Sequence, residues 1–235
     1  MGTDLETLIS RRFDELAESA VFPDDLASDD FQLRAALEWL GDVRDCFILD
    51  VGCAKGRFVK VLSGMGARVV GADPTWKLIR VASKHVPDSR FVASTITRLP
   101  FADAMCDAVL CIEVIEHVPE IDLALSELAR VLKPGGKAII IEKNPMGIGY
   151  YRLYPNWLYK TMMERRGRWF YPREFPFRER WHSPWSLRRR LRPHFTEVEI
   201  RYLDGRVKGL RRRLLAPIFR LFPALRPDVA WCGIK

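Results

Sequence analysis

Apolar runs alternate with amphipathic stretches through the middle of the chain, which predicts repeated strand–helix units. Near-continuous apolar runs predict buried strands over 46–51, 67–72, 90–93, 107–112 and 136–142. Apolar residues at helical spacing predict helices near 56–65, 75–86 and 120–132. The last of these helices is ended by Lys133-Pro134-Gly135-Gly136. Strands and helices in alternation are typical of an α/β fold with a parallel sheet.

The two flanks of this middle region have different patterns. Residues 3–40 have apolar positions at helical spacing and predict two helices, separated near Pro23, which either cap the core or cover a substrate. Residues 196–202 alternate like a strand, and 230–234 suits a last short strand. We expect four regions: an N-terminal helical cap over 1–44, a core over 45–145, an aromatic and basic substrate insertion over 146–194, and C-terminal strands with a basic amphipathic helix over 195–235.

Composition adds a bound on size and a charge asymmetry. A chain of 235 residues is long enough for one α/β domain with additions. Residues 146–235 contain 21 Lys and Arg against 7 Asp and Glu, which suggests an anionic partner for this third. Five cysteines without a C-x-x-C pair, an acidic N-terminus without a signal peptide and the lack of a long apolar span lead us to expect a cytoplasmic protein.

The first apolar run ends at Asp50 and turns on Gly52 and Gly56. The dinucleotide fingerprint requires a third glycine, so this loop disfavours a diphosphate, and the acid suits an ammonium or hydroxyl group better. Asp73 closes the next strand, where an acid meets the ribose hydroxyls of a nucleoside. Alternatively, the glycines serve only helix packing and Asp73 only caps a helix. With the Glu113–Val118 stretch after the fourth predicted strand, these residues converge on the carboxyl edge of the sheet.

Five motifs in this order resemble the class I S-adenosylmethionine-dependent methyltransferases across residues 45–143. They are Asp50-Val51-Gly52-Cys53-Ala54-Lys55-Gly56, Val70-Gly71-Ala72-Asp73, Arg98-Leu99-Pro100-Phe101, the Asp107–Val118 stretch, and Arg130-Val131-Leu132-Lys133-Pro134-Gly135-Gly136. The resemblance is to methyltransferases of type 11 and, more distantly, to the ubiquinone-pathway O-methyltransferases. It implies a Rossmann-like fold with a mostly parallel seven-stranded sheet, helices on both faces, and S-adenosylmethionine as cofactor.

The resemblance also implies which residues hold the cofactor. They are Asp50, Gly52, Cys53, Ala54, Gly56, Asp73, Pro74, Thr95 and Ile96. By the resemblance, Asp50 and the two glycines border the methionine moiety, Asp73 takes the ribose hydroxyls, and Thr95 with Ile96 lies by the adenine. This chain departs from the family where Ala54 replaces the usual middle glycine and where neutral Thr95 replaces an acid that accepts from the adenine amino group. Losing one charged hydrogen bond costs about 1.5–3 kcal/mol, which weakens binding without abolishing it.

The Glu113-x-x-Glu116-His117 stretch predicts acid–base or metal chemistry. On a helix, Glu116 and His117 are the i+3 and i+4 neighbours of Glu113, so the three side chains converge. With His182 they resemble the cluster that ubiquinone-pathway and small-RNA 2′-O-methyltransferases use to hold a divalent metal against acceptor hydroxyls. We therefore expect Glu113, Glu116, His117 and His182 as ligands of Mg²⁺, Mn²⁺ or Zn²⁺, with His117 and Glu116 catalytic. In the alternative, His117 is a metal-free base or a hydrogen-bonded wall residue.

The basic third of the chain suggests the acceptor. Residues 150–185 interleave Tyr, Trp and Phe with Arg, which suits either a lid over an apolar or planar acceptor or an ordinary helical insertion. Residues 207–224 mix Arg with Leu, Ile and Phe, a composition typical of a helix that lies in an anionic membrane surface, although a helix docked on the sheet fits too. We expect O-methylation of an apolar, quinone-like or lipid-like small molecule by a peripheral membrane protein; methylation of an RNA 2′-hydroxyl, or cofactor binding without turnover, are the alternatives. Nucleic acid is less favoured because glycine and serine do not accompany the arginines.

Overall fold

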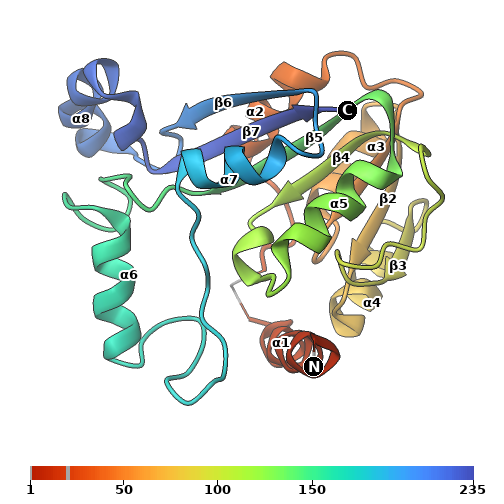
Figure 1. Ribbon diagram of the computed structural model, residues 1–235, viewed down its shortest axis with the longest axis horizontal. Helices are drawn as coiled ribbons and strands as arrows, with labels where there is room; N and C mark the ends of the chain where they lie inside the picture. Colours follow the sequence, from red (N-terminus) through yellow and green to blue (C-terminus); the bar gives the residue numbers. More distant parts are fainter. Residues whose placement is uncertain (1, 20–21) are drawn as a thin grey trace.

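The computed structural model describes residues 2–19 and 22–235, so Met1 and residues 20–21 of the predicted cap lie outside it. Within the described residues, seven strands form one sheet in the order β3-β2-β1-β4-β5-β7-β6 (Figure 1). The strands are β1 (Phe47–Val51), β2 (Arg68–Asp73), β3 (Arg90–Ala93), β4 (Cys106–Ile112), β5 (Leu132–Lys143), β6 (Glu197–Leu203) and β7 (Asp228–Ile234). Among the described strands, only β7 is antiparallel to its neighbours, β5 and β6. The predicted mostly parallel, seven-stranded sheet is confirmed.

The helices include all those that the apolar spacing predicts. They are α1 (Gly2–Leu16), α2 (Phe31–Leu40), α3 (Arg57–Gly64), α4 (Trp76–His85), α5 (Ile121–Val131), α6 (Asn156–Arg165), α7 (Pro184–Leu191) and α8 (Gly209–Leu221). The sequence did not resolve α6 and α7, because arginines and aromatic residues crowd this stretch and obscure its period. Strand β5 begins four residues earlier than predicted, since the pairing of β4 with β5 shifts register between Cys106 and Ala108 and accommodates the Pro-Gly-Gly turn.

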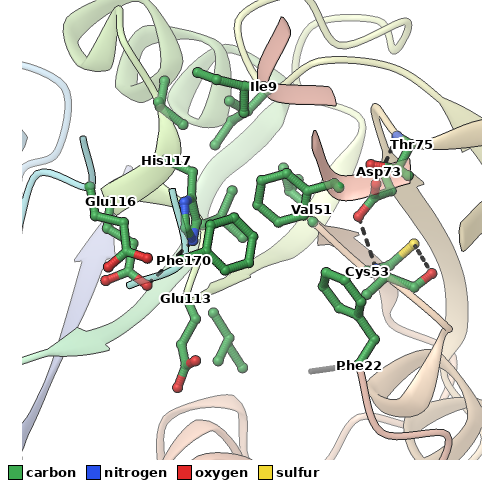
Figure 2. A pocket seen from close by; sticks show the side chains of 18 of the residues that line it. Ile9, Phe22, Val51, Cys53, Asp73, Thr75, Glu113, Glu116, His117 and Phe170 are labelled. Carbon is green, nitrogen blue, oxygen red and sulfur yellow. Dashed lines mark hydrogen bonds and ion pairs between the residues drawn. The ribbon is translucent and has the colours of Figure 1, made fainter. Parts of the chain in front are cut away.

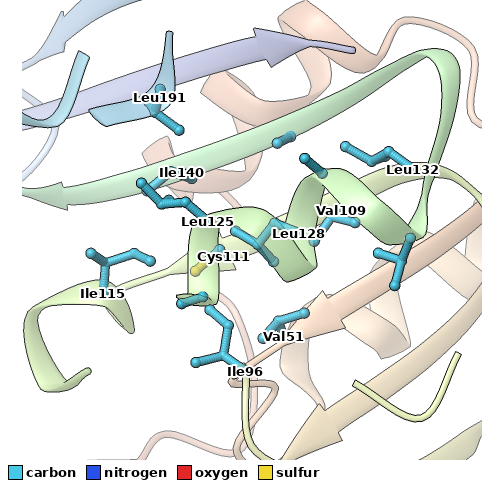
Figure 3. Packing of buried hydrophobic residues seen from close by; sticks show 14 of the residues in the cluster. Val51, Ile96, Val109, Cys111, Ile115, Leu125, Leu128, Leu132, Ile140 and Leu191 are labelled. Atoms are coloured by element: carbon cyan, nitrogen blue, oxygen red, sulfur yellow. The ribbon is translucent and has the colours of Figure 1, made fainter. Parts of the chain in front are cut away.

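Alternate residues of the central strands pack against helices on opposite faces of the sheet. Leu49 of β1 faces a core that contains Leu125 and Leu128 of α5 together with residues of α7 (Figure 3). Its neighbour Ile48 faces the other core, which contains Ala36 of α2 and residues of α3 and α4. Because side chains alternate across a strand, burial on both faces produces the continuous apolar runs seen in the sequence. The prediction of helices on both faces is therefore confirmed.

The order of the strands creates a crevice beside β1. The chain moves from β1 to β2 and β3 on one side of the sheet, then returns to β4 and continues to β5 on the other. The carboxyl ends of β1 and β4 therefore border a topological switch point, where ligands bind in open α/β sheets. Helix α1 lies across this edge rather than on a sheet face (Figure 1). Ser10 of α1 donates to the carbonyl of Pro74 at 2.9 Å, and the backbone N–H of Lys77 donates to Asp14 at 3.2 Å.

The stretch predicted as an insertion over 146–194 has two parts. Helix α6 and the loop after it extend from the sheet (Figure 1). The segments on either side of α6 provide aromatic residues, Tyr151 before it and Trp169 and Phe170 after it, to the cavity described below. Helix α7 instead buries Leu187 and Leu191 in the core beside α5. The part of this stretch that extends from the core therefore ends before Pro184.

Candidate functional site

A cavity of about 680 Å³ lies at the carboxyl edge of the sheet, where β1, β2 and β4 end. One side, here called the donor side, is lined by Asp50, Gly52, Cys53, Ala54, Asp73, Pro74, Thr95 and Ile96. The other side, here called the acceptor side, is lined by Phe13, Glu113, Glu116, His117, Lys143, Tyr151, Trp169, Phe170, Glu179 and Arg206. Figure 2 shows His117 and Phe170 across the cavity from Asp73 and Cys53. Every predicted cofactor residue except Gly56 lines this cavity, and Gly56 is the N-cap residue of α3, with φ +80°.

Backbone geometry explains the loop between β1 and α3. Gly52 has φ +74°, and a Cβ placed there would lie 2.2 Å from Cγ2 of Val114, so a side chain cannot be accommodated. Ala54 also has positive φ, +46°, which costs an L-residue about 1–2 kcal/mol. Its N–H donates to Oδ2 of Asp73 at 3.0 Å. The replacement of glycine by Ala54 therefore strains the loop without closing the cavity.

Asp73 organises the donor side through both carboxylate oxygens. Oδ2 accepts from Ala54, and Oδ1 accepts from the N–H of Thr75 at 2.8 Å. Each carboxylate oxygen has further lone-pair capacity, so Asp73 can still accept from a ribose hydroxyl while it holds these two backbone groups. Asp73 is not the N-cap of α4, because that position is Thr75 and has no side-chain capping bond, so the helix-capping alternative is wrong. The Asp73 side chain instead holds the turns on both sides of it and lines the cavity.

Asp50 fits a cationic ligand. It is 2% exposed, lines the cavity, and its Oδ2 has no hydrogen-bond partner among the described residues. Burial raises the pKa of Asp50 to about 7, with nearby Arg57 opposing the rise and Asp73 adding to it. A buried carboxylate without a partner is costly. S-adenosylmethionine carries an ammonium and a sulfonium charge, so it suits this site.

His117 is the centre of the acceptor side. Its Nδ1 lies 3.0 Å from the hydroxyl of Tyr171, and its Nε2 lies 3.5 Å from Oε1 of Glu116. Phe13 of α1 meets the imidazole edge to face at 5.0 Å between centroids, and Phe170 lies 5.2 Å away. Burial raises the pKa of Tyr171, so its hydroxyl stays protonated at neutral pH. The imidazole is thus fixed between two aromatic rings with a defined partner at each nitrogen.

A buried cluster of charges adjoins His117. Nζ of Lys143, at the end of β5, lies 2.6 Å from Glu116 and 3.2 Å from Glu113. Burial on its own would raise the pKa of Glu116, but the charges of Lys143 and His117 and their hydrogen bonds lower it to about 2. Arg206 pairs with Glu113 and, through Nε at 2.6 Å, with Asp228 of β7. Glu116 therefore stays ionised because Lys143 neutralises it, whereas burial raises the pKa of Asp228 although Arg206 opposes the rise.

The four predicted metal ligands are not brought together. Glu113 has φ +58°, and the following turn is a 3₁₀ helix, η1 (Ile115–His117), so the expected α-helical i+3 and i+4 relation fails. The Glu113 carboxylate instead points away from His117 (Figure 2) and also accepts from Gln32 at 2.9 Å. His182 does not join the cluster, and its Nε2 is buried without a partner among the described residues.

Glu179, rather than Glu113 or His182, lies beside Glu116 and His117. In the described part of the chain, Glu116, His117 and Glu179 have ligand atoms within 4.8 Å of one another. Glu179 accepts from the indole N–H groups of Trp169 and Trp181 at 3.0 and 3.1 Å. With the ammonium of Lys143 already against Glu116, these residues do not fit a divalent cation, because the compensating positive charge is built into the chain.

The sequence analysis did not predict several residues that line the site. Lys143 follows a buried apolar strand, so the rule that identified Asp50 and Glu113 at strand ends could have identified it. Glu179 and Tyr171 lie in the aromatic stretch, where no period marks which residues turn inward. Glu6 of α1 also lines the cavity, and nothing in the spacing of α1 distinguishes it from the other acids of that helix.

Comparison with known proteins identifies the family. A family model described as a methyltransferase domain matches residues 49–140. A demethylmenaquinone methyltransferase of Renibacterium salmoninarum is 30% identical over 167 residues, which cover 66% of this chain and 70% of that protein. The chain belongs to the class I S-adenosylmethionine-dependent methyltransferases. The resemblance inferred from the five motifs is thereby confirmed.

Further relatives of this methyltransferase match shorter stretches or only the fold. A ubiquinone biosynthesis O-methyltransferase of Agrobacterium fabrum is 40% identical over 93 residues, 38% of this chain, and the match spans only 37% of that relative's length. Phosphoethanolamine N-methyltransferase 2 of Haemonchus contortus, solved with phosphomonomethylethanolamine and S-adenosylhomocysteine, has a TM-score of 0.70 at 16% identity. That alignment covers 98% of this chain and 60% of the other, and it shows a common fold.

Donor affinity should depend on the ionisation of Asp50. Below pH 7 the carboxyl is neutral in the free protein, while a cationic donor favours the ionised form, so affinity for S-adenosylmethionine should fall by up to about tenfold per pH unit below that pKa. Calorimetry between pH 5.5 and 8.5, with Asp50→Asn as the matched variant, measures this. The variant should bind more weakly at pH 8 and lose the pH dependence; an unchanged pH dependence in Asp50→Asn would contradict the assignment.

Proposed function

We propose that this methyltransferase transfers the methyl group of S-adenosylmethionine to a hydroxyl oxygen of an apolar, planar small molecule such as a quinol or catechol. The observation that carries the proposal is the acceptor side, where His117 lines the cavity between Phe13 and Phe170 and its Nδ1 lies 3.0 Å from the hydroxyl of Tyr171. Flat aromatic walls suit a planar ring, and an imidazole at the cavity suits removal of a hydroxyl proton.

The chemistry requires alignment and proton removal. Bound S-adenosylmethionine supplies an electrophilic methyl group on a sulfonium. For His117 to act as the base, its Nδ1–H donates to the hydroxyl oxygen of Tyr171, which leaves Nε2 unprotonated so that it can accept the proton of the acceptor hydroxyl. Glu116, 3.5 Å from Nε2, stabilises the imidazolium that forms. Lys143 keeps Glu116 ionised, so the carboxylate does not itself become protonated.

The remaining acceptor-side residues favour an apolar acceptor. Tyr151 stacks on Tyr159 at 4.5 Å and 9° and meets Trp169 edge to face at 5.7 Å. Tyr151, Trp169 and Phe170 all line the cavity. Two of the relatives described above, a ubiquinone biosynthesis O-methyltransferase and a demethylmenaquinone methyltransferase, are named for quinones, which supports a quinone-type ring as acceptor.

Acceptor class and base can be tested together. With labelled S-adenosylmethionine, a catechol carrying a prenyl tail should be methylated on oxygen, while an RNA oligonucleotide should not be. His117→Gln should lower kcat about 100-fold or more, since general base catalysis contributes about 10²–10⁴. Affinity for S-adenosylhomocysteine should stay within about threefold, and His85→Gln, on the exposed end of α4, should behave as the wild type. Labelled RNA, or an unchanged kcat in His117→Gln, would refute the proposal.

We also propose that α8 lies in an anionic membrane surface, from which an apolar acceptor enters. Leu215 and Phe219 of α8 are buried in a small cluster with Val207. A second apolar row is exposed: Leu210 71%, Leu214 63%, Ile218 38%, Leu221 74% and Phe222 60%. The spacing of 210, 214, 218 and 221 puts these residues on one helical face, and Arg211, Arg213 and Arg220 flank that face. An exposed apolar row between arginines suits acyl chains below anionic headgroups.

The neighbourhood of α8 agrees with this proposal. Arg206, just before α8, lines the acceptor side of the cavity. Leu153, Trp157 and Leu158, at and before α6, are also exposed, and Figure 1 shows α6 and α8 at the same end of the molecule. Within the described residues, none of the helices has both the length and the apolar character needed to cross a bilayer. Any association through α8 is therefore with the surface of a membrane.

Vesicle binding tests the α8 surface. Replacing Leu210, Leu214 and Leu221 with Ser should weaken binding to vesicles of phosphatidylglycerol and phosphatidylcholine at least about tenfold, because each exposed leucine contributes about 1.5–3 kcal/mol when buried. Leu123→Ser, an equally polar change at an exposed leucine of α5, is the control and should bind normally. Equal binding by the triple variant and the control would contradict the proposal.

A further inference from the structure

At the end of β3 the sheet supplies no charged acceptor for the adenine of the donor. Asp50 at the end of β1 suits the charged amino-acid part of the donor, and Asp73 at the end of β2 suits the ribose. The base extends from the ribose away from its 5′ carbon, so in the order β3-β2-β1 it lies over the end of β3. There Thr95 and Ile96 line the cavity, and neither carries a negative charge. The amino group of adenine is a donor and loses free energy when buried without an acceptor.

A carboxylate reaches this position from α1. Glu6 lines the cavity, and its Oε1 accepts from the hydroxyl of Thr97 at 2.7 Å. Oγ1 of Thr97 lies 2.9 Å from Oγ1 of Thr95. Because the single hydroxyl hydrogen of Thr97 goes to Glu6, Thr95 is the donor in the second bond, and Glu6 is the final acceptor of the chain. The strongest acceptor beside the β3 end therefore belongs to the N-terminal helix.

We propose that Glu6 accepts a hydrogen bond from the amino group of the donor's adenine and thereby selects adenine at this site. Glu6 supplies the charged acceptor that the neutral side chain of Thr95 does not provide. The inference concerns the donor and does not depend on which acceptor is methylated. It also links the two sides of the cavity, because Phe13, two turns farther along α1, packs on His117.

A ligand pair separates this role from simple anchoring of α1. Glu6→Met removes the carboxylate at nearly constant size, and Glu15→Met, at a side chain 65% exposed on the same helix, is the control. Calorimetry compares S-adenosylhomocysteine with its analogue in which hydrogen replaces the adenine amino group. Glu6→Met should bind S-adenosylhomocysteine about tenfold to a hundredfold more weakly than the wild type, and the analogue within about threefold of it.

The other outcomes overturn the inference. If Glu6→Met weakens both ligands equally, Glu6 only anchors α1 through Thr97. If it weakens neither, the carboxylate does not contact the base. If the wild type binds neither ligand, the donor assignment itself fails, whereas a failed acceptor assay with normal binding leaves the role of Glu6 intact.

Thr97→Val, which keeps Glu6 but removes its hydrogen-bond partner, should reduce selectivity for adenine less than Glu6→Met does.

Discussion

The ion pair between Lys143 and Glu116 connects the parts of the acceptor side. Lys143 ends β5 and Glu116 lies in the turn after the neighbouring parallel strand β4, and their charged atoms are largely buried and lie 2.6 Å apart. A buried pair of this kind is costly to form, and removing one partner costs about 3–5 kcal/mol because a bare charge remains. The pair keeps Glu116 ionised beside His117, and Lys143 also contacts Glu113, which Arg206 ties to Asp228 of β7. Lys143 at the end of β5 is therefore linked through these ion pairs to the residues after β4, to the first residue of β7 and, through Glu116, to the proposed base His117.

The donor side is built on backbone geometry instead of paired charges. Gly52 and Ala54 both have positive φ, and Asp73 holds the loop through the N–H of Ala54. Asp50 is buried, and its Oδ2 has no hydrogen-bond partner within residues 2–19 and 22–235, which suits a ligand that brings positive charge. On the acceptor side, Lys143 of the chain itself neutralises the buried carboxylate of Glu116. On the donor side, bound S-adenosylmethionine would bring the positive charge to Asp50. Helix α1 spans both sides, with Glu6 near β3 and Phe13 on His117.

The sequence predicted the parts of the fold that depend on periodic burial. Strands buried on both faces gave continuous apolar runs, so the sheet, its helices and the donor loop could be located. The acceptor side was predicted less well because its residues come from segments far apart in the chain, brought together by tertiary packing. Glu113 is an example. Its spacing to His117 fits an α-helix, but Glu113 has a left-handed backbone conformation and its carboxylate pairs with Arg206, so it points away from His117. Glu179 and Glu6 have no local pattern that marks them, whereas Lys143 could have been identified from its place at the end of a buried strand.

We infer that Lys143 provides the positive charge which a divalent metal would otherwise bring to Glu113 and Glu116. The most direct measurement is the metal content of the purified protein, by plasma mass spectrometry, with methyl transfer assayed before and after exhaustive chelation. The account predicts far less than one metal ion per chain and unchanged kcat in excess chelator, with Lys143→Met losing activity that added Mg²⁺, Mn²⁺ or Zn²⁺ does not restore in full. One bound metal per chain, with activity lost on chelation and recovered on its return, would contradict it.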